Sequence, residues 1–255
     1  MVVDKINLDA SALISLDELG RDKSKLIRLS YPVPDQNYAS TILQSLCELG
    51  VDAICLEPFI GKGFRNVVLA GIWRGELVAT KIRRIDSVVK DTIRETTIHR
   101  MANEVGVGPR LLGNCGPVIL MELIEGEDLS SWLLKITDEE VEEAREVISD
   151  LLSQCFSLDR AGIDHDELSD ASKHVLRRGR NVVILDFGSA KITLKPSNLT
   201  SIISYLFYGP VRRVVVDILD MEKPSIEDLR QYKSNITLER FEEIYHHIIG
   251  RRLVG

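Results

Sequence analysis

The sequence predicts an α+β protein of two lobes, and three observations lead to that prediction. Apolar runs with strand character are concentrated between residues 57 and 124. Helical spacing of apolar residues dominates from residue 125 onward. No internal repeat divides the 255 residues, so a sheet region is followed once by a helical region. We therefore expect three segments: an N-terminal extension (1–56), a sheet lobe (57–124) and a helical lobe (125–255).

The composition is that of a globular protein and excludes several classes. Charged residues make up 28% of the chain and the net charge is −7, so neither nucleic acid nor an anionic membrane is expected as the main partner. The four cysteines are scattered without metal-ligand spacing. No apolar run approaches the length of a membrane span and no leader pattern is present, which predicts a cytoplasmic protein.

The first two segments differ in pattern. Residues 1–56 alternate short apolar runs with polar turns, and 39–48 have helical spacing before Gly50. We expect this extension to cap the sheet lobe; a small winged helix is the alternative, but no clear recognition helix is present. Residues 57–84 predict two strands joined through Gly71 to Gly75. A helix over 90–104 and a short buried strand over 117–124 follow.

Helix-start and helix-stop residues divide the third segment. Thr137 and Glu140 form a capping-box pattern that predicts a helix running to Gly162. Ser225 with Asp228 predicts a second start. Residues 237–249 predict a further helix, ended by Gly250. The segment is thus expected to be mainly helical.

A pair of glycines stands between the first two apolar runs of the sheet lobe. In IGKGFRNVV (60–68), Gly61 and Gly63 would let main-chain N–H groups approach phosphate oxygens closely. Two glycines in a hairpin are also simply compatible with a turn. The phosphate interpretation therefore depends on other elements of the chain.

A lysine ends the next apolar run. Lys81 closes VATK (78–81), and Glu95 lies on the helix predicted to follow. A lysine buried in an apolar strand requires a partner, and a helix carboxylate would both neutralise it and orient it toward phosphate. The alternative is a solvent-exposed lysine on an edge strand.

An aspartate follows the apolar run of VVILDFG (182–188). A carboxylate at a strand end suits Mg²⁺, which takes oxygen ligands and bridges phosphates, so Asp186 is a candidate metal ligand. The alternative is an ordinary β-turn of Asp-x-Gly type. The order and spacing of the glycines, the lysine and this aspartate favour a phosphate-transfer site.

Taken together, residues 57–190 resemble the protein-kinase superfamily. The resemblance implies a phosphate-covering loop at Gly61 and Gly63, a Lys81–Glu95 pair and a metal-binding Asp186. It also identifies LMELIEGEDL (120–129) as the hinge, where the main chain of Glu122 and Ile124 would hold adenine, next to Met121, and Glu127 would reach the ribose.

The sequence departs from typical kinases in ways that point to a smaller group. After Asp186 there is no A-P-E segment and no long activation loop, as in the RIO and KEOPS-complex kinases. The segments KIRRID (81–86), MANEVGVGPRLL (101–112) and HDELSDASKHV (165–175) resemble an archaeal group of predicted Ser/Thr protein kinases related to RIO kinases. The resemblance implies a two-lobed kinase-like fold with a truncated helical lobe, and ATP and Mg²⁺ as cofactors.

The loop that should carry the catalytic base is altered. Aligned with G-I-I-H-G-D-L, the stretch GIDHDEL places Glu167 at the catalytic aspartate, and Leu168 supports that alignment; Asp166 is the competing base. The metal-binding asparagine is replaced by Ser172. Lys173 is a candidate for binding phosphate, and His174 reaches the asparagine position if two residues are inserted.

These observations predict an ATP- and Mg²⁺-dependent atypical Ser/Thr protein kinase, autophosphorylating or mainly an ATPase. Two alternatives remain open: a pseudokinase that acts as a nucleotide-binding scaffold, and a small-molecule phosphotransferase. A protein substrate or a ribosome- or tRNA-related assembly is the expected partner, without a membrane. Four arginine pairs occur in the sequence, at 83–84, 177–178, 212–213 and 251–252. A phosphate-rich partner would be expected only if several of these pairs lay close to the candidate site.

Overall fold

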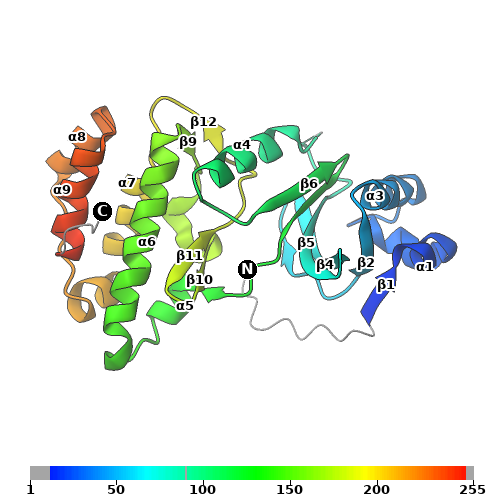
Figure 1. Ribbon diagram of the computed structural model, residues 1–255, viewed down its shortest axis with the longest axis horizontal. Coiled ribbons are helices and arrows are strands. Elements are labelled where there is room, and N and C mark those ends of the chain that lie inside the picture. The colour runs from blue at the N-terminus through cyan, green and yellow to red at the C-terminus, as the bar shows by residue number, and fades with distance from the viewer. Residues whose placement is uncertain (1–11, 90, 251–255) are drawn as a thin grey trace. The chain divides into compact units, whose positions relative to one another are not determined.

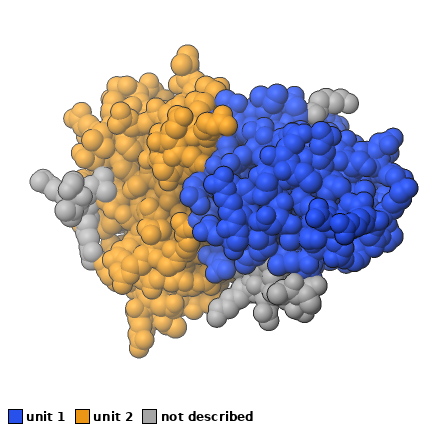
Figure 2. Space-filling model, turned by 45° about the vertical axis from the view of Figure 1, so that its right-hand side comes forward, with its two compact units in different colours: residues 1, 3–97, 109–125 blue, residues 2, 98–108, 126–255 orange. Residues whose placement is uncertain are grey.

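The computed structural model describes residues 12–89 and 91–250, which form two compact units (Figures 1 and 2). Unit 1 comprises residues 12–89, 91–97 and 109–125, and unit 2 comprises 98–108 and 126–250. The boundary crosses helix α4 (Ile93–Glu104). Unit 1 contains an antiparallel sheet and unit 2 contains most of the helices, so the predicted α+β class is confirmed.

Seven antiparallel strands form the sheet of unit 1. They are β1 (Leu13–Ser15), β2 (Val51–Cys55), β3 (Gly61–Lys62), β4 (Asn66–Trp73), β5 (Glu76–Arg83), β6 (Leu111–Cys115) and β7 (Val118–Glu122). Their spatial order is β1-β2-β4-β5-β7-β6, and β3 pairs with β4. The predicted hairpin is β4–β5, which turns at Arg74 and Gly75, both at positive φ. Gly71 lies inside β4 instead, where a Cβ would approach the Thr80 hydroxyl at 3.0 Å.

The N-terminal extension belongs to the same sheet. It contributes α1 (Leu16–Arg21), α2 (Lys23–Leu26) and α3 (Gln36–Glu48), together with β1 and β2. β2 pairs with β4, so the sheet continues across the predicted boundary at residue 56. The predicted helix over 39–48 is part of α3, which starts earlier because the Asp35 carboxylate accepts a hydrogen bond from Tyr38 N at 2.7 Å. Residues 1–11 of the extension lie outside the described residues.

The two faces of the central strands carry different side chains. One set of alternate residues packs with α1 and α3 in a buried core: Val67, Leu69, Val78, Ile82, Val118 and Leu120. The other set points to the opposite face because side chains alternate along a strand. It consists of Val68, Ala70, Ala79, Lys81, Ile119 and Met121. Lys81 therefore lies on a face with two alanines rather than in the main core of unit 1.

Helices form the body of unit 2 (Figure 1). They are α5 (Leu129–Leu133), α6 (Val141–Arg160), α7 (Asn198–Tyr208), α8 (Ile226–Ser234), α9 (Leu238–Ile249) and a π-helical turn (Val214–Ile218). The capping box predicted at Thr137 is present, the helix start predicted at Ser225 also has a capping box, and Gly250 ends α9 with a left-handed φ of 71°. The apolar face of α6 is buried in one large core that also includes residues of α7 and α9.

Short strands in unit 2 bring two loops to one place. They are β8 (Glu127–Asp128), β9 (Ile163–Asp164), β10 (Val175–Arg178), β11 (Asn181–Ile184) and β12 (Lys191–Ile192). β10 and β11 form a hairpin in which Val175 is opposite Ile184, so the chain before β10 and the chain after β11 are neighbours. β9 pairs with β12, with Asp164 opposite Lys191. Residues 165–174 and 185–190 thus lie together.

No helix in the described ranges is long and apolar enough to cross a membrane.

Candidate functional site

The lysine predicted to bind phosphate forms a buried ion pair. Lys81 Nζ lies 2.5 Å from Glu95 Oε1, and the two side chains are only 5% and 15% exposed. Glu95 is in the first turn of α4, where a carboxylate is also favoured by the helix dipole. The exposed edge-strand alternative for Lys81 is therefore excluded, and an ammonium held in this way has a fixed position.

The register of the sheet aligns the first glycine with this lysine. Gly61 pairs with Val68, and Val68 pairs with Lys81. Three neighbouring strands therefore carry Gly61, Val68 and Lys81 in one row, which separates Gly61 from Lys81 by about 10 Å at the usual strand spacing. The next row on the same face contains Ala70, Ala79 and Met121.

Sequence reasoning did not single out the two alanines. Ala70 and Ala79 lie opposite each other, and Ala79 lies opposite Met121, the residue proposed to border an adenine. Ala70 and Ala79 are both buried, at 0% and 4% exposure, and their small side chains leave more room beside a cation for a flat aromatic ring than larger side chains would. The sequence signal that could have indicated them is the presence of one alanine in each of two neighbouring apolar runs, VLA (68–70) and VATK (78–81).

The two glycines occupy a tight hairpin turn, residues 61–66, called the glycine turn below. Gly63 N donates to Asn66 O at 2.9 Å, and Gly63 O accepts from Arg84 Nη1 at 2.9 Å. The N–H of Gly63 is thus used within the turn in this conformation. Phe64 at the tip is 96% exposed.

The predicted hinge residues directly follow β7. The Glu122 carboxylate accepts a hydrogen bond from Arg110 N at 3.1 Å, so the side chain is used locally. The adenine contact predicted for Glu122 involves its main chain, whose N–H already donates to Arg110 O at 2.9 Å. Ile124 is buried as a whole residue, at 4% exposure.

Glu127, the residue suggested to reach the ribose, already has a cationic partner. Its carboxylate forms an ion pair with Arg177, which also binds Glu143 and lies over the Trp132 ring at 4.1 Å. β8 pairs with β10, which brings Glu127 and Arg177 opposite each other. This partnership between segments 50 residues apart could not be predicted from the sequence.

In unit 2, the candidate metal ligand Asp186 follows β11 directly. It has a left-handed φ of 66°, which is uncommon for a residue other than glycine, and its Oδ1 accepts from Gly188 N at 3.1 Å. Strained backbone of this kind clusters at functional sites. The Asp-x-Gly turn considered as the alternative is present, and the predicted metal ligand Asp186 is its first residue.

The two candidate bases have different environments. Asp166, at φ 72°, forms an ion pair with Lys191 at 2.6 Å, and Lys191 also lies 3.7 Å from the buried Asp164. Glu167 is 40% exposed, and its nearest ionic partner is His174, at 4.0 Å. Both carboxylates are accessible, since the Asp166 side chain is 49% exposed, but Asp166 has a close cationic partner and Glu167 does not.

Asp170 binds both residues that were predicted to replace the second metal ligand. The Ser172 hydroxyl donates to one carboxylate oxygen at 2.5 Å, and Lys173 Nζ donates to the other at 2.7 Å. The hydrogen bond from Lys173 holds the pKa of Asp170 below its usual range, with Ser172 adding to the effect. The Lys173–Asp170 pair is exposed, so little free energy opposes its opening.

His174 occupies the position directly before β10. Its carbonyl accepts from Leu185 N at 2.8 Å, which places His174 beside the residue that precedes Asp186. Which of His174 and Ser172 corresponds to the metal-binding asparagine stays a prediction. No group of three or more His, Cys, Asp or Glu side chains within residues 12–89 and 91–250 is arranged to hold a metal.

Aromatic rings hold the neighbouring backbone in place. Phe187 stacks on His99 of α4 at 5.1 Å and meets His165 edge-on at 5.5 Å. The ring of His165 contacts the Leu185 carbonyl through Nε2 at 2.9 Å. Burial lowers the pKa of His165, which favours its neutral form. His99 itself is packed, at 3% exposure.

A buried polar network holds the start of the loop 165–174 through the main chain of His165. Asn198 Oδ1 accepts from His165 N at 2.9 Å, and the Asn198 amide donates to Asp159 at 2.7 Å. Asp159 of α6 also accepts the main-chain N–H groups of Asn198 and Leu199, which begin α7, and the Tyr232 hydroxyl. Burial raises the pKa of Asp159, and these donors offset part of that rise.

We expect Asp159→Asn to lower the free energy of unfolding by about 2 kcal/mol, because an amide group would then face the donors of Leu199 and Tyr232. Urea denaturation measures the change. Tyr232→Phe, which removes only one donor, should cost about half as much. Wild-type stability in Asp159→Asn would contradict this role.

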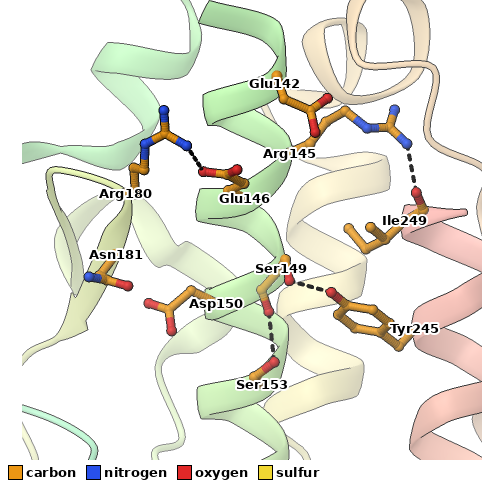
Figure 3. A pocket seen from close by; sticks show the side chains of 10 residues that line it. All are labelled: Glu142, Arg145, Glu146, Ser149, Asp150, Ser153, Arg180, Asn181, Tyr245 and Ile249. Carbon is orange, nitrogen blue, oxygen red and sulfur yellow. Dashed lines mark hydrogen bonds and ion pairs between the residues drawn. The ribbon is translucent and has the colours of Figure 1, made fainter. Parts of the chain in front are cut away.

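A groove of about 360 Å³ lies elsewhere on unit 2 (Figure 3). Ten residues line it: Glu142, Arg145, Glu146, Ser149, Asp150, Ser153, Arg180, Asn181, Tyr245 and Ile249. Several of these side chains are already paired, including Arg180 with Glu146 and Ser149 with Tyr245. The groove adjoins the start of β11, whereas Asp186 follows its end, so it contains none of the predicted site residues.

No protein-family model matches this chain, and a search of curated proteins finds no match to it. Its function must therefore be argued from the geometry of its own residues.

Proposed function

We propose that this protein is an ATP- and Mg²⁺-dependent phosphotransferase, an atypical Ser/Thr protein kinase of the RIO- and KEOPS-kinase-like type. Autophosphorylation or ATP hydrolysis is included in the proposal. The observation that carries it is the buried Lys81–Glu95 pair, which is aligned across the sheet with Gly61. A buried cation with its own carboxylate, beside a glycine turn, suits a phosphate group.

Unit 1 would bind the nucleotide. Lys81, oriented by Glu95, would donate to phosphate oxygens, and Gly61 would allow the turn to approach them. The face with Ala70 and Ala79 would receive the adenine, held by the main chain of Glu122 and Ile124. Gly63 would contribute mainly through the shape of the turn, because its N–H already binds Asn66.

Unit 2 would provide the groups for transfer. Asp186 offers the carboxylate oxygen that Mg²⁺ prefers, and one or two carboxylates plus phosphates are enough for this ion in nucleotide sites. Bound Mg²⁺ would neutralise charge on the transferred phosphate. Glu167 would accept the proton of an acceptor hydroxyl, and Asp166 would hold the loop through Lys191.

A pseudokinase is the second candidate, favoured by one observation. Ser172 and Lys173 both bind Asp170, which leaves Asp186 as the main metal ligand. A site with one metal ligand would bind a nucleotide yet transfer phosphate slowly. A small-molecule phosphotransferase remains as a third outcome of the same experiment.

Incubation with ATP labelled at the γ-phosphate, in the presence of Mg²⁺, tests the proposal. We expect label on the protein or as released phosphate, at a slow rate. ATP binding without turnover would support the pseudokinase, and a labelled metabolite from a cell extract would support a small-molecule acceptor. Absence of ATP binding would remove the proposal.

The choice of base gives a separate prediction. Glu167→Gln should lower kcat by ~10²-fold with an unchanged KM for ATP, because it removes only the proton acceptor. Asp166→Asn should lower kcat less than about tenfold, because that carboxylate is bound to Lys191 and its loss affects loop geometry alone. Steady-state kinetics of the two isosteric variants measure both effects. A larger loss in Asp166→Asn would reverse the assignment.

A further inference from the structure

The glycine turn is held by a residue outside it. Arg84 follows β5 and reaches back to the turn with both its main chain and its side chain. Arg84 N donates to Arg65 O at 2.8 Å, and Arg84 Nη1 donates to Gly63 O at 2.9 Å. Two carbonyls within residues 63–66 are therefore bound by one arginine.

The guanidinium of Arg84 is itself fixed. Its Nε and Nη2 donate to the two oxygens of Asp86, at 2.8 and 2.6 Å. This fork geometry restricts rotation of the group, and the Arg84 side chain is only 17% exposed. A lysine could not make the same three contacts, because it lacks the planar arrangement of donors.

An aromatic ring from the N-terminal extension covers the same arginine. Arg84 lies over the Tyr31 ring at 5.2 Å, and Lys62 of the turn lies over that ring at 4.6 Å. Phe59 packs edge-on against Tyr31 at 5.3 Å. Tyr31 O also accepts from Ile85 N at 3.0 Å. One ring of the extension thus contacts both a cation of the turn and the arginine that holds it.

We propose that Arg84 and Tyr31 are positioning residues that keep the glycine turn in one conformation and so set the affinity of the protein for nucleotide phosphates. The inference rests on the proposed function. It also gives the N-terminal extension a role, because Tyr31 lies in the extension, between α2 and α3. A turn fixed before binding loses less conformational entropy when phosphate arrives.

Hydrogen exchange in the nucleotide-free protein tests directly whether Arg84 and Tyr31 restrain the glycine turn. Arg84→Met should speed exchange in residues 61–66 by about tenfold and leave α9 unchanged. Tyr31→Leu should have a smaller effect of the same sign, whereas Tyr31→Phe, which keeps the ring, should exchange as the wild type does. Arg74→Met is the matched control: Arg74 lies over Trp73 at 4.3 Å, at the opposite turn of the β4–β5 hairpin.

Comparison of ATP with adenosine tests the consequence for binding. Arg84→Met should weaken ATP binding by about tenfold and leave adenosine binding unchanged, since the turn acts on phosphates alone. A general loss of structure would weaken both ligands equally. Tyr31→Phe should keep the wild-type ratio of the two affinities, and so should Arg74→Met.

Three results distinguish a failure of the proposed function from a failure of this inference. If the wild-type protein binds neither ATP nor adenosine, both the proposed function and this inference are overturned. If the wild type binds both, and Arg84→Met shows the same ATP-to-adenosine ratio, only this inference is overturned. Unchanged exchange in residues 61–66 of Arg84→Met would also overturn this inference alone.

Discussion

Replacement of Asp186 by asparagine is expected to lower Mg²⁺-dependent phosphoryl transfer by ~10³-fold without unfolding the protein. Asparagine tolerates the left-handed φ of 66° and retains an oxygen to accept the hydrogen bond from Gly188 N. The local geometry should therefore persist while the negative charge is lost. A hard cation bound by one protein carboxylate would lose its main ligand. Turnover at increasing Mg²⁺ concentrations, together with thermal unfolding, measures both parts of the prediction.

Asp220 provides a matched control for this substitution. It is an exposed aspartate of unit 2, and it also has a positive φ, at 49°. Asp220→Asn therefore makes the same chemical change in a similar backbone conformation, and turnover should remain at the wild-type level. Full activity in Asp186→Asn, or equal losses in both variants, would show that Asp186 does not hold the metal.

The sequence allowed the local elements to be predicted because their signals are local. The capping boxes at Thr137 and Ser225 and the stop at Gly250 rely on residues within one helical turn of each other. The pairing of Lys81 with Glu95 was also predictable, since a buried lysine needs a carboxylate and the next helix offered one. The structure was needed only to exclude the exposed edge-strand alternative for Lys81.

Contacts between distant segments could not be predicted from the sequence. Asp166 was distinguished from Glu167 by Lys191, which lies 25 residues further along the chain and meets Asp166 through the pairing of β9 with β12. Strand β10 was missed because HVLRR is short and ends in two arginines. The partners of Ser172 and Lys173 depend on the side-chain geometry of a 3₁₀ segment, which periodicity does not describe.

The N-terminal extension shows the same limit. Its helix α3 was recognisable by spacing, yet the sheet pairing of β2 with β4 requires a register between segments that flank the turn-rich region 56–65. Tyr31 stands in the polar stretch YPVPDQN, which by composition predicts only a turn. Its ring acquires a role through Lys62 and Arg84, which lie much further along the chain. These contacts arise from tertiary structure rather than from a local sequence pattern.

The largest effect on stability is expected from breaking the Lys81–Glu95 pair. Lys81→Met leaves a carboxylate that is only 15% exposed without its cation, and should lower the free energy of unfolding by about 3 kcal/mol. Lys81→Met combined with Glu95→Gln removes both charges and should recover most of that loss. Phosphoryl transfer should stay at least ~10²-fold below wild type in both variants, because neither carries an ammonium for the phosphates. Urea denaturation and turnover assays on the same preparations separate stability from function.

The exposed pair of Lys25 with Glu18 is the matched control, because it has the same 2.5 Å separation but side chains that are 37% and 53% exposed. Lys25→Met should change the free energy of unfolding by less than about 1 kcal/mol, since water screens the remaining carboxylate. A similar loss in Lys25→Met would mean that burial is not the cause of the effect at Lys81. Activity restored in the double variant would mean that Lys81 only balances charge in unit 1, and the phosphate role would pass from this lysine to another cation.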